Sequence, residues 1–134
     1  MAVRSAVRLA WELARFILVF LGGGAGSALR YGVSLAVYKH YPGRLPLGTF
    51  VINVTGSFLA GALMTVLTRR ASHPNWRLLL VTGFLGGYTT FSSFEYETLI
   101  AAQGGNALVA LGNVLASVSL GFVAVWLGSA LAAR

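Results

Sequence analysis

Four long stretches of the chain contain almost no charged residues, and this pattern limits the folds open to it. The stretches cover residues 16–38, 47–68, 78–102 and 107–133. A helix needs about 20 mostly apolar residues to cross the hydrocarbon core of a bilayer, and each stretch is long enough. The three prolines all lie between the stretches, where helices are expected to end: Pro42, Pro46 and Pro74. The sequence therefore predicts an all-α integral membrane protein with four transmembrane helices.

The composition excludes several classes of function. Only 10% of the residues are charged, whereas a soluble domain averages about 25%, so the bilayer is the expected solvent. No cysteine is present, which removes disulfides and thiolate chemistry. The net charge of +7 comes from basic residues dispersed along an apolar chain, so no nucleic-acid surface is indicated. With three carboxylates and two histidines, we expect no enzyme.

Residues 1–15 are distinct from the apolar region that follows. Arg4, Arg8, Glu12 and Arg15 recur at helical spacing, which is typical of an amphipathic helix at the membrane interface. A cleaved signal peptide is the alternative interpretation, because a basic stretch precedes an apolar one. We expect this interfacial helix at 1–15 and a single four-span channel domain at 16–134.

The basic residues outside the four stretches are unevenly distributed between the two ends of the predicted bundle. Seven fall on the side of both termini: Arg4, Arg8, Arg15, Arg69, Arg70, Arg77 and Arg134. Two fall on the other side, Lys39 and Arg44. The positive-inside rule then predicts that both termini lie in the cytoplasm.

The first stretch contains the segment GGGAGSALR, residues 22–30. Gly22 and Gly26 are four residues apart, and such small residues most simply allow close helix packing. Arg30 is costly in hydrocarbon, so its side chain should reach a vestibule, the headgroup layer or a partner. Snorkelling of the side chain near a helix end is an equally good explanation.

The second stretch carries Thr49, Asn53, Ser57 and Gly61, four residues apart, which places them on one helical face. The Asn53 amide needs a hydrogen-bond partner at membrane depth, either on another helix or on a solute that passes through. The fourth stretch repeats the pattern with Asn113 and Ser117, which either line a polar path or bond to neighbouring helices.

The most specific segment is GFLGGYTTFSSFEYE, residues 83–97 in the third stretch. Glycines followed by paired threonines and serines hold a helix poorly, so we expect a break here. Non-helical backbone at membrane depth must be buried or line a cavity, and its free carbonyls can hold a cation. Phe91 and Phe94 share a face beyond the break. Two phenylalanines most simply pack, but their positive ring edges can also accompany an anion.

Together, GFLGGYTTFSSFEYETL, GGGAGSALRY, GTFVINVTGSFLAG and the polar positions of the fourth stretch resemble the small bacterial Fluc-type fluoride channels. The resemblance covers the chain from Phe16 onward. It implies an antiparallel, dual-topology dimer in the bacterial inner membrane, with two fluoride pores and a structural sodium ion between the subunits. It also implies passive export of fluoride, which limits its toxicity.

The resemblance further implies roles for individual residues. Asn53 would donate an N–H to fluoride, Phe91 and Phe94 would line the path, and Ser92, Ser93 and Ser117 would supply hydroxyl donors. Gly86 and Thr89 would offer backbone carbonyls to sodium, and Arg30 would lie near the vestibule. Glu97 matches a family acid whose role the sequence does not define.

Three alternatives follow from the same residues. The seven-to-two basic asymmetry is unlike a chain that inserts both ways, so a heterodimer with an oppositely oriented homologue competes with a homodimer. A proton-coupled small multidrug antiporter also has four spans, but it needs a carboxylate within a span. A non-transporting membrane subunit would use the glycines and polar residues only to pack helices.

Overall fold

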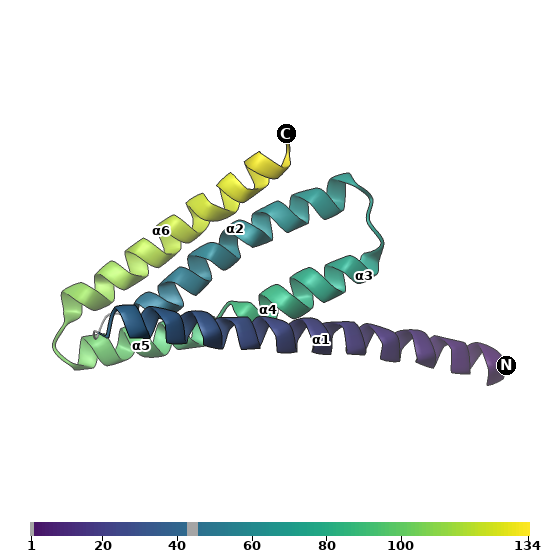
Figure 1. The fold of residues 1–134 in the computed structure, drawn as a ribbon, viewed down its shortest axis with the longest axis horizontal. Coiled ribbons are helices and arrows are strands. Elements are labelled where there is room, and N and C mark those ends of the chain that lie inside the picture. Colours follow the sequence, from purple (N-terminus) through teal and green to yellow (C-terminus); the bar gives the residue numbers. More distant parts are fainter. Residues whose placement is uncertain (1, 43–45) are drawn as a thin grey trace.

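The computed structural model describes residues 2–42 and 46–134, and these residues form helices joined by short connections (Figure 1). The elements are α1 (Ala2–His40), α2 (Leu47–Arg69), α3 (Pro74–Trp76), η1 (Arg77–Leu85), α4 (Gly86–Tyr88), α5 (Phe91–Gln103) and α6 (Ala107–Ala132). Within the described ranges there is no strand. The all-helical prediction is therefore confirmed.

The first helix is longer than the first predicted span. α1 continues without interruption for 39 residues, which at 1.5 Å per residue is about 58 Å. The amphipathic segment expected within residues 1–15 is thus the first part of the same helix. In Figure 1 this part of α1 extends beyond the remaining helices.

The helices pack in two groups, and α2, which lies in the first group, also contacts α1 and η1 of the second. α2 lies along α6, and α1 lies along η1 and α4 (Figure 1). Glycines allow the backbones of the second group to approach closely, since a Cβ at Gly22 would collide with the Leu79 carbonyl and one at Gly26 with the Phe84 carbonyl. The interpretation of these two glycines as a packing face is confirmed.

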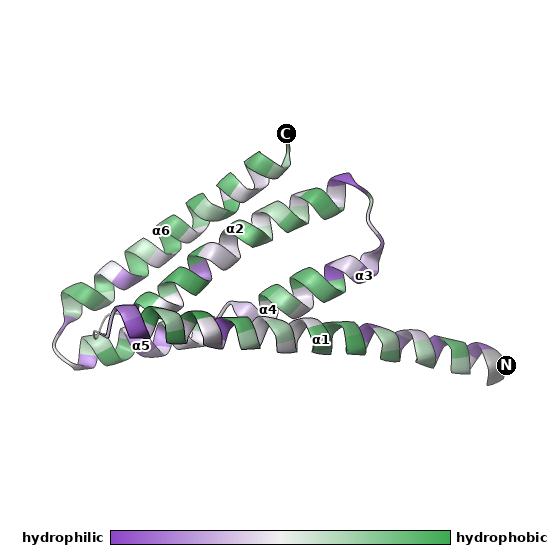
Figure 2. Ribbon diagram, viewed as in Figure 1, coloured by the Kyte–Doolittle hydropathy of each residue, from purple (hydrophilic) through white to green (hydrophobic). Residues whose placement is uncertain are grey.

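The C-terminal ends of α2 and α6 point the same way in Figure 1, and the N-terminal part of α1 projects well beyond them. The Arg69 guanidinium donates to the carbonyl of Ala133 and so joins the C-terminal ends of α2 and α6. α2 and α6 are long and apolar enough to cross a membrane, and Figure 2 shows hydrophobic residues along most of both helices. These features are those of a membrane protein.

Few side chains are fully enclosed in the single chain. Ile52 on α2 is 1% exposed, and the other buried apolar side chains include Leu85, Tyr88 and Phe94 on η1, α4 and α5. The core thus sits where α2 meets the third predicted span. This is also where the helix of that span is interrupted.

Candidate functional site

The third predicted span is broken at two threonines. α4 ends at Tyr88, Thr89 and Thr90 are extended with ψ of 155° and 111°, and α5 begins at Phe91. The expected break is confirmed. The preceding glycines, which we expected to weaken the helix, remain helical: a Cβ at Gly87 would collide with the carbonyl of Gly23, so this glycine serves close packing.

Asn53 on α2 binds both backbone groups of Thr90. Its Nδ2 donates to the Thr90 carbonyl at 3.0 Å, and its Oδ1 accepts from the Thr90 amide at 2.9 Å. A side-chain amide supplies one acceptor and two N–H donors, so the pair of bonds satisfies backbone groups that the break removes from the helix. One N–H of Asn53 remains available after these bonds are counted.

Thr90 also caps the helix that follows it. Its Oγ1 accepts from the Ser93 amide at 3.2 Å and donates to Ser93 Oγ at 2.9 Å. A threonine hydroxyl at this position satisfies one of the unpaired amides of the first helical turn. Thr90 is itself 8% exposed. The break is therefore held by Asn53 on α2 and by the cap at the start of α5.

These two arrangements leave two carbonyl groups without their helical partners. In a continuous helix the Gly86 carbonyl would accept from the Thr90 amide, and the Thr89 carbonyl from the Ser93 amide. Both amides donate elsewhere, to Asn53 Oδ1 and to Thr90 Oγ1. Carbonyl oxygens freed in this way are hard donors that can coordinate an alkali cation. Gly86 and Thr89 are the two residues expected from the sequence to do so.

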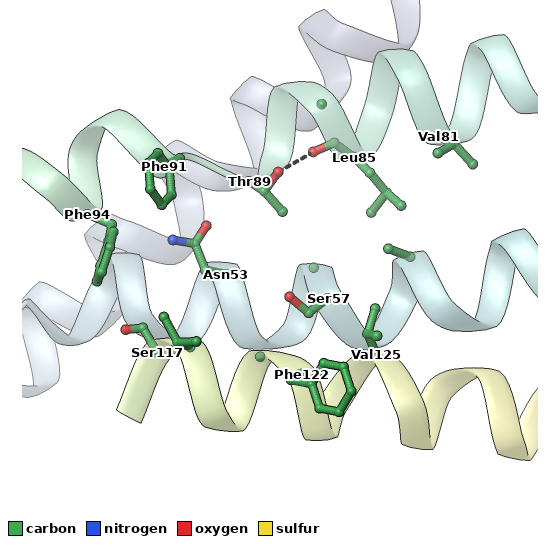
Figure 3. Close-up of a pocket in the computed structure, with 15 residues that line it drawn as sticks. Asn53, Ser57, Val81, Leu85, Thr89, Phe91, Phe94, Ser117, Phe122 and Val125 are labelled. Atoms are coloured by element: carbon green, nitrogen blue, oxygen red, sulfur yellow. Dashed lines mark hydrogen bonds between the residues drawn. The ribbon is translucent and has the colours of Figure 1, made fainter. Parts of the chain in front are cut away.

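A cavity of about 560 Å³ adjoins the break (Figure 3). It is bordered by α2, η1, α4, α5 and α6. Its polar lining residues are Asn53, Ser57, Thr89 and Ser117, and its aromatic lining residues are Phe91, Phe94 and Phe122. The remaining lining residues are small or aliphatic: Gly56, Ala60, Val81, Leu85, Gly86, Val118, Gly121 and Val125. The cavity is mostly apolar with a few hydrogen-bonding groups.

The two phenylalanines of α5 that line this cavity differ in how far they are exposed. Their ring centroids are 5.6 Å apart and the ring planes are inclined by 40°. Phe94 is 8% exposed, whereas Phe91 is 69% exposed, and Figure 3 shows both near Asn53. The single chain therefore encloses one ring and presents the other at its surface.

The structure brings most of the predicted site residues together, but not all of them. Asn53, Gly86, Thr89, Phe91, Phe94 and Ser117 line the cavity. Ser92 and Ser93 do not line it; their hydroxyls lie 3.4 Å and 2.9 Å from Thr90 Oγ1. Arg30 is half-buried on α1 and does not line the cavity.

Two further polar contacts lie along the same helices. Tyr88 is buried and its hydroxyl is 2.9 Å from Thr55 Oγ1 on α2. Thr49 Oγ1 donates to Glu97 Oε1 at 2.7 Å, while the buried Glu97 Oε2 has no partner among the described residues. Glu97 therefore has an acceptor free for a further donor.

The fourth predicted span is joined to α5 by a short hydrogen-bonded series. Asn113 Nδ2 donates to Thr98 Oγ1 at 2.7 Å, and Ser117 Oγ donates to Asn113 Oδ1 at 3.4 Å. Asn113 thus bonds to the neighbouring helix α5, whereas Ser117 bonds to Asn113 within α6 and lines the cavity. Of the two alternatives left open for this pair, bonding to a neighbouring helix thus applies to Asn113, and a polar path past Ser117 stays a prediction.

Sequence reasoning missed Thr90, although its position carried a signal. A threonine before an apolar residue, with a serine three positions later, is a possible N-cap. The partner of Asn53 could not be read from the sequence, because Asn53 and Thr90 are 37 positions apart.

Comparison with known proteins gives a consistent result. A family model described as CrcB-like protein, Camphor Resistance, matches residues 17–129. A protein from Solibacter usitatus named fluoride-specific ion channel is 53% identical over 121 residues, which cover 90% of this chain and 99% of the relative. Proteins with the same name from Acidobacterium capsulatum and Coxiella burnetii are 50% and 48% identical, covering 85% and 84% of this chain and 92% of each relative.

Proposed function

This chain belongs to the CrcB-like family, whose curated relatives are named fluoride-specific ion channels, and from that premise we propose that it conducts fluoride passively across the bacterial inner membrane. Fluoride enters cells as neutral hydrogen fluoride and is trapped there as the anion. A passive pore lets the accumulated anion leave and so limits its toxicity. Conduction of this kind needs no catalytic residue.

The observation that carries the proposal is the cavity at the broken helix. Fluoride is small and strongly hydrated, so a selective pore must replace its water with fixed donors, as potassium filters replace water with carbonyls. Asn53 keeps one N–H after binding Thr90, and Ser117 lines the same cavity, where its O–H would have to turn from Asn113 Oδ1 to reach an anion. The edges of Phe91 and Phe94 carry partial positive charge and can contact the anion without a buried cation.

We propose that the working unit is an antiparallel dimer in which each subunit crosses the membrane four times. α1, α2, the broken series from α3 to α5, and α6 would be the four crossings. Phe91 lines the cavity and is 69% exposed in the single chain, so a second subunit at this face would enclose the ring. Two such cavities per dimer would give two pores.

The carbonyls of Gly86 and Thr89 fit a structural sodium ion. Both lack their helical amide partners, and two carbonyls from each subunit would supply four oxygen ligands. Bound sodium would supply fixed positive charge that holds the two helix breaks together. The residues of this chain hold the backbone of the break in place, since Asn53 binds Thr90 and Thr90 caps the start of α5.

Efflux from liposomes that contain the purified protein tests the channel function. Fluoride release is followed with a fluoride electrode, chloride release is the control, and a potassium ionophore dissipates the membrane potential. We expect rapid fluoride efflux that depends on the ionophore, without chloride efflux. Absence of ionophore-dependent fluoride flux from a folded dimer would contradict the proposal.

A further inference from the structure

A second cavity lies between α1 and η1, away from the broken helix. Its volume is about 540 Å³, within the range of small-molecule sites. It is lined by Glu12, Arg15, Phe16, Val19, Pro74, Arg77, Leu78 and Thr82. None of these residues lines the cavity beside Asn53. The proposed channel function therefore does not account for it.

The lining changes from charged to apolar along the cavity. α1 and the segment of α3 and η1 both start on the right-hand side of Figure 1 and run toward the left. Along α1 the lining residues are, in order, Glu12, Arg15, Phe16 and Val19, and along η1 they are Arg77, Leu78 and Thr82. The charged side chains therefore precede the apolar ones on both helices. A ligand that fits would carry a negative charge at one end and an apolar chain at the other.

The charge balance of the cavity favours an anion. Two arginines and one glutamate line it. The Glu12–Arg15 pair is long, at 3.8 Å between Oε1 and Nη1, and both side chains are about half exposed. An arginine has five N–H donors in a planar arrangement that suits a phosphate, so this single contact leaves most of the donors of Arg15 free.

We propose that this cavity binds an anionic phospholipid, with the phosphate on Arg15 and Arg77 and the start of an acyl chain against Phe16, Val19 and Leu78. Basic pockets between membrane helices bind anionic headgroups. The apolar inner part distinguishes this ligand from free phosphate, which would gain nothing from it. The hydrophilic residues that Figure 2 shows around the α2–α3 connection and along the first part of α1 place the arginine end at the membrane surface.

Native mass spectrometry of the purified protein tests this site. Phosphatidylglycerol and phosphatidylcholine with identical acyl chains are added separately, and the lipids retained per subunit are counted. The double variant Arg15→Gln/Arg77→Gln should lose the preference for phosphatidylglycerol by about fivefold per arginine, the factor typical of one basic residue near an anionic surface. Arg4→Gln/Arg8→Gln removes the same amount of charge from α1 outside the cavity, and should keep the preference.

Three other outcomes would contradict the proposed lipid site. An equal loss in both double variants would mean that surface charge alone attracts the lipid. An unchanged preference in Arg15→Gln/Arg77→Gln would exclude the arginines, and displacement of the bound lipid by inorganic phosphate would show a site for free anions. If the double variant does not fold, Arg15→Gln and Arg77→Gln are measured singly, each with an expected loss of about fivefold.

Discussion

At the scale of single residues, Asn53 has a structural task that also decides what it can offer a solute. Interhelical bonding and contact with a passing anion were competing explanations from the sequence. The structure shows the first, since both ends of the amide bind Thr90. The second stays compatible with it, because one N–H is left over and Asn53 lines the cavity.

Asn53→Asp should abolish both the bond to the Thr90 carbonyl and the N–H that Asn53 can offer to an anion. The carboxylate cannot donate to the Thr90 carbonyl or to an anion, and it adds a negative charge to the cavity. We expect the fluoride efflux rate to fall by about 10- to 100-fold, because a hydrogen bond to a charged group contributes about 1.5–3 kcal/mol. Thr65→Val is the control, because Thr65 is also on α2 but outside the cavity, and the change removes its bond to Ser129 on α6. Wild-type flux in Asn53→Asp would refute the assignment.

Phe94→Ile tests the aromatic edge. Isoleucine keeps an apolar side chain at this buried position but removes the positive ring edge. Fluoride efflux should fall to the rate of protein-free liposomes while the dimer elutes normally from a sizing column. Phe20→Ile on α1, where the ring is 79% exposed and outside the cavity, should leave efflux unchanged.

At the scale of elements, two kinds of contact hold the broken helix in place. The threonine cap fixes the start of α5, and backbone approach at glycines fixes η1 and α4 against α1. The nine residues of η1 form a π-helix, a wider coil that is usually found only as a short bulge and often near functional sites. Because the cap and these backbone contacts hold both sides of the break, it is a fixed part of the fold and not a frayed helix end.

Thr90→Val should weaken the start of α5. Valine has nearly the same shape, but it leaves the Ser93 amide without its acceptor. We expect the free energy of unfolding to decrease by about 1 kcal/mol, the usual effect of losing a cap, as measured by thermal unfolding in detergent. Thr90→Ser keeps the hydroxyl and should remain close to wild type. Equal losses in the two variants would argue against capping.

Gly26→Ala and Gly24→Ala form a matched pair on α1. A Cβ at Gly26 meets the Phe84 carbonyl, whereas a Cβ at Gly24 meets no atom within 4 Å. Overpacking of this kind costs about 1–3 kcal/mol. The yield of monodisperse protein and its melting temperature should fall for Gly26→Ala alone. Alanine has the higher helix propensity and meets no atom at position 24, so a comparable fall for Gly24→Ala would contradict backbone contact as the cause.

At the scale of the whole molecule, the distribution of basic residues conflicts with insertion in both directions. The sequence predicts seven basic residues on the side of the termini and two, Lys39 and Arg44, on the other, and the positive-inside rule favours one orientation. Arg44 lies outside the described residues. An antiparallel dimer of this chain needs both orientations. A heterodimer with an oppositely oriented homologue needs only one.

Accessibility of tagged termini in intact and opened cells distinguishes these assemblies. For the homodimer we expect each terminus to be labelled from both sides of the membrane, in comparable amounts. Labelling from the cytoplasmic side alone, with a homologous chain co-purifying, would favour the heterodimer. A single orientation with no partner chain would contradict the antiparallel dimer.

The sequence by itself determined the membrane class, the helical fold, the break in the third stretch and the family. These depend on composition and on local spacing, since stretches of about 20 apolar residues have few other solutions. It also selected Asn53, Phe91, Phe94 and Ser117, which do share one cavity.

Only the tertiary structure decided how these residues act on one another. Asn53 and Thr90 are 37 positions apart, and Thr49 and Glu97 are 48 apart, so no periodicity along one helix can pair them. The sequence also could not tell which serines line the cavity. Ser117 does, whereas the Ser93 hydroxyl accepts a hydrogen bond from Thr90 Oγ1 at the cap of α5. Which donors are consumed by the protein and which remain for a ligand depends on packing between helices, because hydrogen bonds are short and directional.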